Sequence, residues 1–391
     1  MNLRQRIVRI IELYQSWNTR ISPDTAFFDS KAGIFHFSGS WRDIGKQLAQ
    51  TSSEARHRNL FSQIIENLRS TQDNTLRKRA NVLQKSIKKS FPQYSDLLCG
   101  WSKYLGLDEQ EGVMLAVWPL LANPEINNLI SCGAYALLDG KGRCTSLGGN
   151  LDLGPTVISA PALFSPNGGP QILAHFALGL PWPTIGVNQY GLAVMGASVN
   201  TLAVPPLFQQ DEILPVYLLP FWILVHGYNT RQTMFLLEQN RLFEPLNGGA
   251  NLLITDKDGE LAQAEISSGS RQVSFIKSDA GIAVNHFLAQ EMQPLNDTNS
   301  SNTRLLLKLS HERYDFARNL APKTPEDLEV LLRSTQGTGA WCRYGKTPDI
   351  GWTSASYLID FRKGVFKSWN GSVPSRPKCR EIHLEDIFDR A

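Results

Sequence analysis

The chain has 391 residues, of which 42% are hydrophobic and 19% are charged, and its formal net charge is +3. This length suits one large domain or two medium ones, and the composition excludes a disordered or collagen-like chain. Basic residues gather before position 132, where 17 Lys and Arg accompany 12 Asp and Glu. In residues 75–91 they surround Leu83 and Ile87 at helical spacing, which indicates a solvated helix face, and we expect no nucleic-acid partner.

The sequence also argues against a secreted or membrane protein. Residues 1–17 are basic and amphipathic but lack the apolar core and the cleavage site of a secretory signal. The longest apolar run, residues 213–227, is interrupted by Pro215 and Pro220 and is too short to span a bilayer. The five cysteines are an odd number without a CxxC pair, which indicates reduced thiols rather than disulfides or a zinc site. We therefore expect a cytoplasmic protein with no metal, no cofactor and no membrane partner.

The predicted secondary structure changes from mainly helix to β-rich runs at the junction of Ser131 and Cys132. Before it the sequence predicts mainly helix, over residues 39–50, 59–70, 75–91, 94–107 and 108–123. After it short β-rich runs appear, in residues 171–178, 184–200, 251–268, 271–278, 281–287 and 353–369. Two helical segments, residues 213–240 and 302–320, interrupt these runs. Strands enclosed by helices indicate a layered α+β fold with antiparallel sheets.

Cys132 stands at the head of the most informative stretch. A strand-like run from Gly133 to Leu138 leads into an Asp-Gly turn, and a second run returns the chain to Asp152. Asp-Gly between apolar runs is a strong hairpin signal. The hairpin would bring the Asp152 carboxylate close to the Cys132 thiol, and a nucleophile beside an orienting charge is suited to covalent acyl chemistry.

Several motifs together resemble a known family. In chain order they are GSWRDIGKQLAQ (39–50), YLGLDEQEGVMLAVWPLL (104–121), CGAYALLDGKGRCTSLGGNLD (132–152), GVNQYGLAVMGASVN (186–200), ANLLITDKDGELAQAEIS (250–267, with Glu265) and AVNHF (283–287). The series resembles the penicillin-type acyltransferases (isopenicillin N acyltransferase and its bacterial relatives) among the N-terminal nucleophile hydrolases. More distantly, it is similar to the bile-salt and penicillin V amidases.

This resemblance implies an αββα four-layer sandwich. Residues 1–131 would form a helical N-terminal segment and residues 132–391 the nucleophile-bearing part, together one integrated domain. It also implies that the chain cuts itself at the Ser131–Cys132 junction and that the two fragments stay associated. The new α-amine of Cys132, with an ordinary pKa of about 7.7–8.0, would then accept the thiol proton.

The resemblance also assigns roles by motif position. Asp152 would hold the α-amine and the thiol, the Asn285 side chain would donate to the oxyanion, and Arg304 would depress the thiol pKa. Asn150 would bind the substrate or only stabilise the hairpin. Weaker candidates for lining the substrate pocket are Ser198, Asn200 and Trp182. The expected activity is cleavage or transfer of acyl groups on small amides or thioesters, through a thioester intermediate.

Three positions depart from the family pattern. Gly149 replaces the Arg that the bile-salt amidases carry before N-x-D, which favours the acyltransferase branch. Ser131 replaces the usual Gly and Gly133 a common Thr, and these two changes leave open one alternative, a catalytically silent member that acts as a binding or scaffold module. Another is an uncut cysteine–histidine amidase that uses His286 or His175. Cys144 is a rival nucleophile on the return strand, but it would have no chain break to provide an amine.

Overall fold

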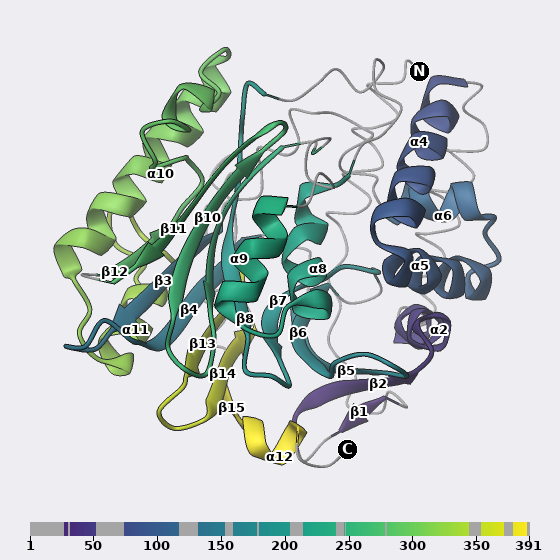
Figure 1. The fold of residues 1–391 in the computed structure, drawn as a ribbon, viewed down its shortest axis with the longest axis horizontal. Helices are drawn as coiled ribbons and strands as arrows, with labels where there is room; N and C mark the ends of the chain where they lie inside the picture. Colours follow the sequence, from purple (N-terminus) through teal and green to yellow (C-terminus); the bar gives the residue numbers. More distant parts are fainter. Residues whose placement is uncertain are drawn as a thin grey trace.

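The computed structural model describes residues 27–29, 32–51, 74–116, 132–152, 159–177, 180–203, 214–239, 246, 248–277, 280–343, 353–370 and 378–388. The expected helix over residues 59–70 and the junction residue Ser131 lie outside these ranges. Within the described residues the chain forms two β-sheets and the helices that cover them (Figure 1).

The larger sheet, sheet A, has nine strands in the order β1-β2-β5-β6-β7-β8-β9-β10-β11. Their bounds are Phe28–Asp29 (β1), Ile34–Gly39 (β2), Ser159–Pro166 (β5), Ile172–Ala177 (β6), Pro183–Asn188 (β7), Ala193–Val199 (β8), Gly249–Thr255 (β9), Leu261–Ser267 (β10) and Ser270–Ile276 (β11). All neighbouring strands are antiparallel except β2 and β5, which run parallel. Sheet A therefore begins with two strands from the N-terminal part of the chain, which the sequence had predicted as mainly helical.

The smaller sheet, sheet B, has six strands in the order β12-β3-β4-β13-β14-β15. Their bounds are Ala280–Ala283 (β12), Gly133–Leu138 (β3), Cys144–Asp152 (β4), Thr353–Asp360 (β13), Val365–Asn370 (β14) and Cys379–His383 (β15). All its pairs are antiparallel. The predicted hairpin is confirmed, because β3 pairs with β4 and the turn is closed by the hydrogen bonds that Asp139 makes to Lys141 and Arg143.

Helices cover the outer face of each sheet. Those near sheet A or beside it are α2 (Trp41–Thr51), α4 (Asn74–Ser90), α5 (Pro92–Tyr104), α6 (Glu109–Ala116), α8 (Leu219–His226) and α9 (Thr230–Gln239), with the 3-10 turn η2 (Val216–Leu218). Those on the side of sheet B are α10 (Ser301–Leu320) and α11 (Pro325–Leu332), and the short segments η4 (Gln293–Leu295) and α12 (Leu384–Phe388) complete the set. In Figure 1, α10 and α11 lie at the left, outside β3, β4 and β12. On the opposite side, at the right of the view, lie α2, α4, α5 and α6.

Three apolar clusters occupy the spaces between these layers. The first, between the two sheets, includes Ala134, Leu147 and Met195. The second lies between sheet A and its helices, and the third lies between sheet B and α10 and α11. Helix, sheet, sheet and helix are thus packed in sequence, which is the expected αββα arrangement of an α+β protein. None of the described helices is long and apolar enough to cross a membrane.

A pair of glycines sets the close approach of α2 and α5. A Cβ atom at Gly45 would overlap the carbonyl of Leu97, and a Cβ atom at Gly100 would overlap the carbonyl of Arg42. Gly45 belongs to the first family-like motif, residues 39–50. Packing explains this glycine, because the backbones of α2 and α5 touch where the two helices cross.

We predict that Gly100→Ala destabilises the protein by about 1–3 kcal/mol, because the added methyl group has no room between the helices. The intrinsic preference of a helix for Ala over Gly, about 1 kcal/mol, acts in the opposite direction and is smaller than the overpacking cost. Urea unfolding measures the change. Gly140→Ala is the control, since a Cβ atom there meets open space; equal stability of the two variants would contradict the close crossing.

Candidate active site

Cys132 directly precedes β3, at the end of the hairpin opposite its turn. The register pairs Gly133 with Asn150, so one further step places Cys132 beside Leu151 and next to Asp152. The Cys132 side chain packs in the cluster between the sheets and is only 4% exposed. The hairpin therefore brings the thiol and the carboxylate into one neighbourhood, as the sequence predicts.

Asp152 is held by a buried ion pair with Arg313 of α10. The Arg313 Nη2 lies 2.7 Å from Asp152 Oδ2, and neither side chain has exposed surface. The hydroxyl of Thr353 donates to the other carboxylate oxygen at 2.6 Å. Arg313 also donates to the carbonyl of Cys132 at 2.9 Å and to the carbonyl of Trp341 at 3.0 Å. One guanidinium thus connects the carboxylate, the backbone of the candidate nucleophile and the segment after α11.

The expectation for Arg304 is corrected here. Arg304 lies in the first turn of α10, is exposed, and donates to the carbonyl of Thr298. Nine residues at 100° per residue rotate a helix by about 180°, so Arg304 and Arg313 project from opposite sides of α10. The arginine that contacts Asp152 is Arg313, and the sequence reasoning missed it. No apolar periodicity marked Arg313 in the sequence, because three of the four buried residues of the helix, Thr303, Ser310 and Arg313, are polar.

At neutral pH the thiol of Cys132 in the intact chain is almost entirely protonated. Burial, together with the negative charge of Asp152, raises the pKa of Cys132 to about 12. A hydrogen bond from the Asp152 backbone N–H and the positive charges of Arg313 and Arg343 act in the opposite direction but do not cancel the rise. Arg343 is itself 6% exposed, and burial beside Arg313 lowers its pKa to about 9. Asp152 and Glu312 lie near enough to oppose this lowering, so both guanidiniums share the site with acidic groups.

Asn285 lies in the turn that follows β12, two residues after the end of that strand. Ala283, the last residue of β12, pairs with Ala134 of β3, the second residue after Cys132. The Asn285 Nδ2 donates to the carbonyl of Ser198, at the end of β8 in sheet A, at 2.8 Å. Asn285 and Ser198 are both half-buried. The carboxamide expected to bind an oxyanion thus lies just beyond the strand that neighbours β3 and contacts sheet A.

The remaining candidates differ in their placement. Asn150 is buried on β4 and donates to the carbonyls of Leu332 and Trp341, so it ties the hairpin to the segment after α11. The Asn200 carbonyl accepts from the Asp297 backbone N–H. Trp182 packs against Tyr217 at 5.8 Å between ring centroids and donates to the carbonyl of Ala116, in the cluster on the outer side of sheet A. The structure therefore gives Trp182 a packing role rather than a place beside Cys132.

Two of the departures from the family pattern have steric explanations. A Cβ atom at Gly133 would lie 3.3 Å from the Trp341 ring and 3.5 Å from the Arg313 side chain. A Cβ atom at Gly149 would lie 2.8 Å from the carbonyl of Gly133 and 3.5 Å from the hydroxyl of Tyr357. An Arg at Gly149 would therefore not fit this packing, whereas a side chain at Gly133 would require the Trp341 ring to shift by a few tenths of an ångström.

The rival nucleophile lies at the other end of the hairpin, and the two candidate histidines contact other groups. Cys144 begins β4 at the turn end of the hairpin, and eight extended residues separate it from Asp152 by about 26 Å. Both ring nitrogens of buried His175 lie near hydroxyls, 3.1 Å from Ser159 and 3.2 Å from Ser368. His286 contacts the hydroxyl of Ser310 at 2.8 Å and stacks on His311. Among the described residues, no three His, Cys, Asp or Glu side chains gather as a metal site would require.

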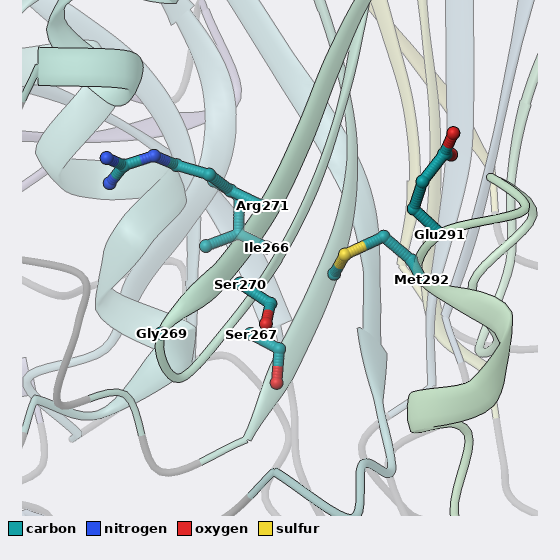
Figure 2. Close-up of a pocket in the computed structure, with 7 residues that line it drawn as sticks. All are labelled: Ile266, Ser267, Gly269, Ser270, Arg271, Glu291 and Met292. Carbon is teal, nitrogen blue, oxygen red and sulfur yellow. The ribbon is translucent and has the colours of Figure 1, made fainter.

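A surface cavity of about 360 Å³ lies along the same end of sheet A. Figure 2 shows Ile266, Ser267, Ser270 and Arg271 on the β10–β11 hairpin, with Glu291 and Met292 on the segment that follows Asn285. Ser198 pairs with Ala250, and Ala250 pairs with Ile266. The cavity is thus two strands, or about 10 Å, from the strand that contacts Asn285.

Comparisons with known proteins agree with this picture. The family model of the acyl-coenzyme A:6-aminopenicillanic acid acyl-transferases matches residues 142–364, which is more than half of the chain and includes Asp152, Asn285 and Arg313 but not Cys132. No curated protein matches the chain.

Solved structures similar to the chain include two acylases. Penicillin V acylase from Agrobacterium tumefaciens is 15% identical, with a TM-score of 0.46 over 66% of this chain and 88% of that one. Conjugated bile acid hydrolase from Clostridium perfringens, in two variant structures, is 13% identical, with a TM-score of 0.37 over 65% of this chain and 93% of that one.

We predict that Arg313→Met lowers the free energy of unfolding by about 3–5 kcal/mol, because it leaves the buried Asp152 carboxylate without its partner. Arg304→Met is a matched control on the same helix and should change stability by less than about 0.5 kcal/mol. Chemical unfolding of both variants measures the difference. A small loss for Arg313→Met would show that the ion pair does not hold the site together.

The pKa of Cys132 yields a prediction for thiol reactivity. With a pKa of about 12, the reactive thiolate at pH 8 amounts to about 10⁻⁴ of the uncut chain, against about a quarter for an ordinary cysteine. Alkylation by iodoacetamide should therefore be about a thousandfold slower than for a free cysteine and should rise tenfold per pH unit. Mass spectrometry of the Cys132 peptide from the intact chain measures the rate. Rapid labelling at pH 8 would contradict it.

Proposed function

The chain belongs to the acyl-coenzyme A:6-aminopenicillanic acid acyl-transferase family, and on this basis we propose that it is a cysteine N-terminal nucleophile enzyme that cleaves or transfers acyl groups. The observation that carries the proposal is the hairpin end, where buried Cys132 lies next to Asp152 and where β12, the strand that leads to Asn285, pairs with β3. A nucleophile, an orienting carboxylate and an amide donor in one place are the parts that acyl transfer through a thioester requires.

The first proposed step is cleavage of the peptide bond between Ser131 and Cys132. Before cleavage the pKa of the Cys132 thiol is near 12, and His175 and His286 contact hydroxyl groups elsewhere. The Cys132 thiol would attack the Ser131 carbonyl carbon and pass its proton to the departing amide nitrogen, and water would then hydrolyse the thioester that forms. This would leave a carboxylate on Ser131 and an α-amine on Cys132 itself, with an ordinary pKa of about 7.7–8.0. Arg313 holds the Cys132 carbonyl and Asp152 together, which supports a nucleophile that stays in place after the bond on its amino side is broken.

In the next step the α-amine takes the thiol proton and the sulfur attacks the substrate carbonyl. The Asn285 carboxamide, together with a backbone N–H, donates to the oxygen as negative charge develops on it. When the tetrahedral intermediate collapses, the leaving amine takes the proton from the α-ammonium and the acyl group remains on sulfur as a thioester. Water then gives hydrolysis, and an amine gives transfer.

The proposed substrates are small amides or thioesters, so the proposed partners are small molecules. A cavity of about 360 Å³ near the end of β8 is within the size range of small-molecule sites and is part of the proposed substrate region. We further propose that the protein works in the cytoplasm. In support, all five cysteines are free thiols, which fits a reducing compartment.

Cleavage at Cys132 is the first test. Purified protein should give two fragments, and the larger one should begin Cys132-Gly133 by N-terminal sequencing. Cys132→Ala should stay whole and inactive, whereas Cys144→Ala, which changes the buried cysteine at the far end of β4, should be cut and active. A wild-type chain that stays whole and is not labelled by an acyl probe at neutral pH would instead favour a silent binding module. Activity in an uncut chain that is lost on replacing His286 or His175 would favour the cysteine–histidine alternative.

The role of Asn285 is the second test. Asn285→Ala should lower kcat by a factor of about 10²–10³, because it removes one donor to the oxyanion. The two fragments of the chain should still form and fold correctly. Steady-state kinetics on a small amide substrate, with thermal unfolding to confirm the fold, measures the effect. An unchanged kcat would remove Asn285 from the mechanism while leaving the thiol chemistry intact.

A further inference from the structure

Side chains from sheet A reach the turn that carries Asn285. β12 ends at Ala283, and Val284 and His286 form an isolated bridge with each other, so Asn285 occupies the tip of a tight turn. The polar side chains that contact this turn come from β9 and β10.

Asn251 of β9 contacts both sides of the turn. Its Nδ2 donates to the carbonyl of His286 at 3.1 Å and lies 3.4 Å from the carbonyl of Val284. The Asn251 side chain is completely buried. A single carboxamide thus connects the residue before Asn285 with the residue after it, and the turn cannot open without breaking both contacts.

Gln263 of β10 orients Asn251 in turn. Its Nε2 donates to Asn251 Oδ1 at 2.8 Å and to the carbonyl of Ile282 at 3.1 Å. With Oδ1 accepting from Gln263, the Asn251 amide nitrogen must face the two turn carbonyls. Gln263 therefore donates to Asn251, Asn251 donates to the turn, and each of these donors meets an acceptor.

The segment beyond the turn is anchored in the same way. The carboxylate of Glu265, which is 2% exposed, accepts from the backbone N–H groups of Leu288 at 2.6 Å and Ala289 at 2.9 Å. The Asn296 side chain accepts from the Phe287 N–H at 2.9 Å and contacts its carbonyl. The turn that carries Asn285 is fixed before, at and after its tip.

From these contacts we propose that Asn251 is a positioning residue that holds the Asn285 carboxamide in place, with Gln263 and Glu265 supporting it from the adjacent strand. This inference rests on the proposed function, in which Asn285 donates to the oxyanion. Electrostatic stabilisation of this kind requires a donor that is fixed before the charge develops, because ordering a mobile amide during the reaction would raise the activation free energy. Asn251 supplies that fixation without touching the substrate itself.

The test is the near-isosteric variant Asn251→Asp, which replaces the donor nitrogen by an oxygen facing two carbonyls. We expect kcat to fall by about a hundredfold, approaching the effect of losing the oxyanion donor, while KM changes less than about twofold. Asn188→Asp is the matched control, because Asn188 is also completely buried and also donates to two carbonyls, those of Leu224 and Gly227. Both variants should lose stability, but only Asn251→Asp should lose kcat per folded molecule.

A double-mutant cycle separates positioning from a general loss of structure. If Asn251 acts through Asn285, the double variant Asn251→Asp/Asn285→Ala should be less than about twofold slower than Asn285→Ala alone. Independent, multiplicative losses would overturn the inference, as would full kcat in Asn251→Asp. Should that variant fail to fold, Gln263→Leu should lower kcat about tenfold through the weakened orientation of Asn251, and an unchanged kcat would overturn the inference.

A crystal structure of the Asn251→Asp protein gives a readout that does not depend on turnover. The 2.8 Å contact from Asn285 to the Ser198 carbonyl should be lost or lengthened, and its retention would overturn the inference. Turnover of the wild type that requires Cys132 tests the proposed function separately. A wild type without turnover contradicts the proposed function, and the positioning role is then decided by this structural comparison alone.

Discussion

Asp152 and Arg313 form an ion pair with no exposed side-chain surface, and three separate parts of the chain meet at it. Removing two charges from water costs several kcal/mol per ion, and hydrogen-bond partners for the other polar atoms of the pair offset part of that cost. Here Thr353, the Cys132 carbonyl and the Trp341 carbonyl provide those partners. The pair is therefore stable only when the hairpin, α10 and the segment around Trp341 are all docked, which makes the geometry at Cys132 a property of the whole of sheet B.

The site also spans the two sheets. Cys132 and Asp152 belong to the hairpin of sheet B, whereas Asn285 contacts the end of β8, and its turn is bound by β9 and β10 of sheet A. The apolar cluster between the sheets sets the distance between these two halves. Because protein interiors are close-packed, changes in that cluster would move the oxyanion donor relative to the nucleophile.

Local patterns in the sequence were sufficient for much of this structure. The Asp-Gly turn between apolar runs predicted the β3–β4 hairpin and the meeting of Cys132 with Asp152, since both depend on residues close in the chain. The order of motifs predicted the α+β sandwich. By contrast, β2 pairs with β5 more than a hundred residues away, and no local signal in the N-terminal part distinguished this strand from its helical surroundings.

The error over the arginine has a similar origin. Arg304 was chosen from a short motif, but which face of α10 is buried depends on its packing against sheet B. Arg313 and Arg343 reach Cys132 from segments 181 and 211 positions further along the chain, so their contribution to the site follows from tertiary structure. Asn251 is comparable: its sequence context is an ordinary strand, and only the fold shows that its amide meets the turn around Asn285.

The parallel pairing of β2 with β5 has a consequence for the lifetime of the molecule. β2 comes from before Cys132 and β5 from after it, so a break at that residue would leave two polypeptides hydrogen-bonded within one sheet. Separating them would mean unfolding sheet A, and recovery would then become a bimolecular encounter of two incomplete chains. Once matured, such a molecule would owe its persistence to a slow rate of opening rather than to reversible equilibrium folding.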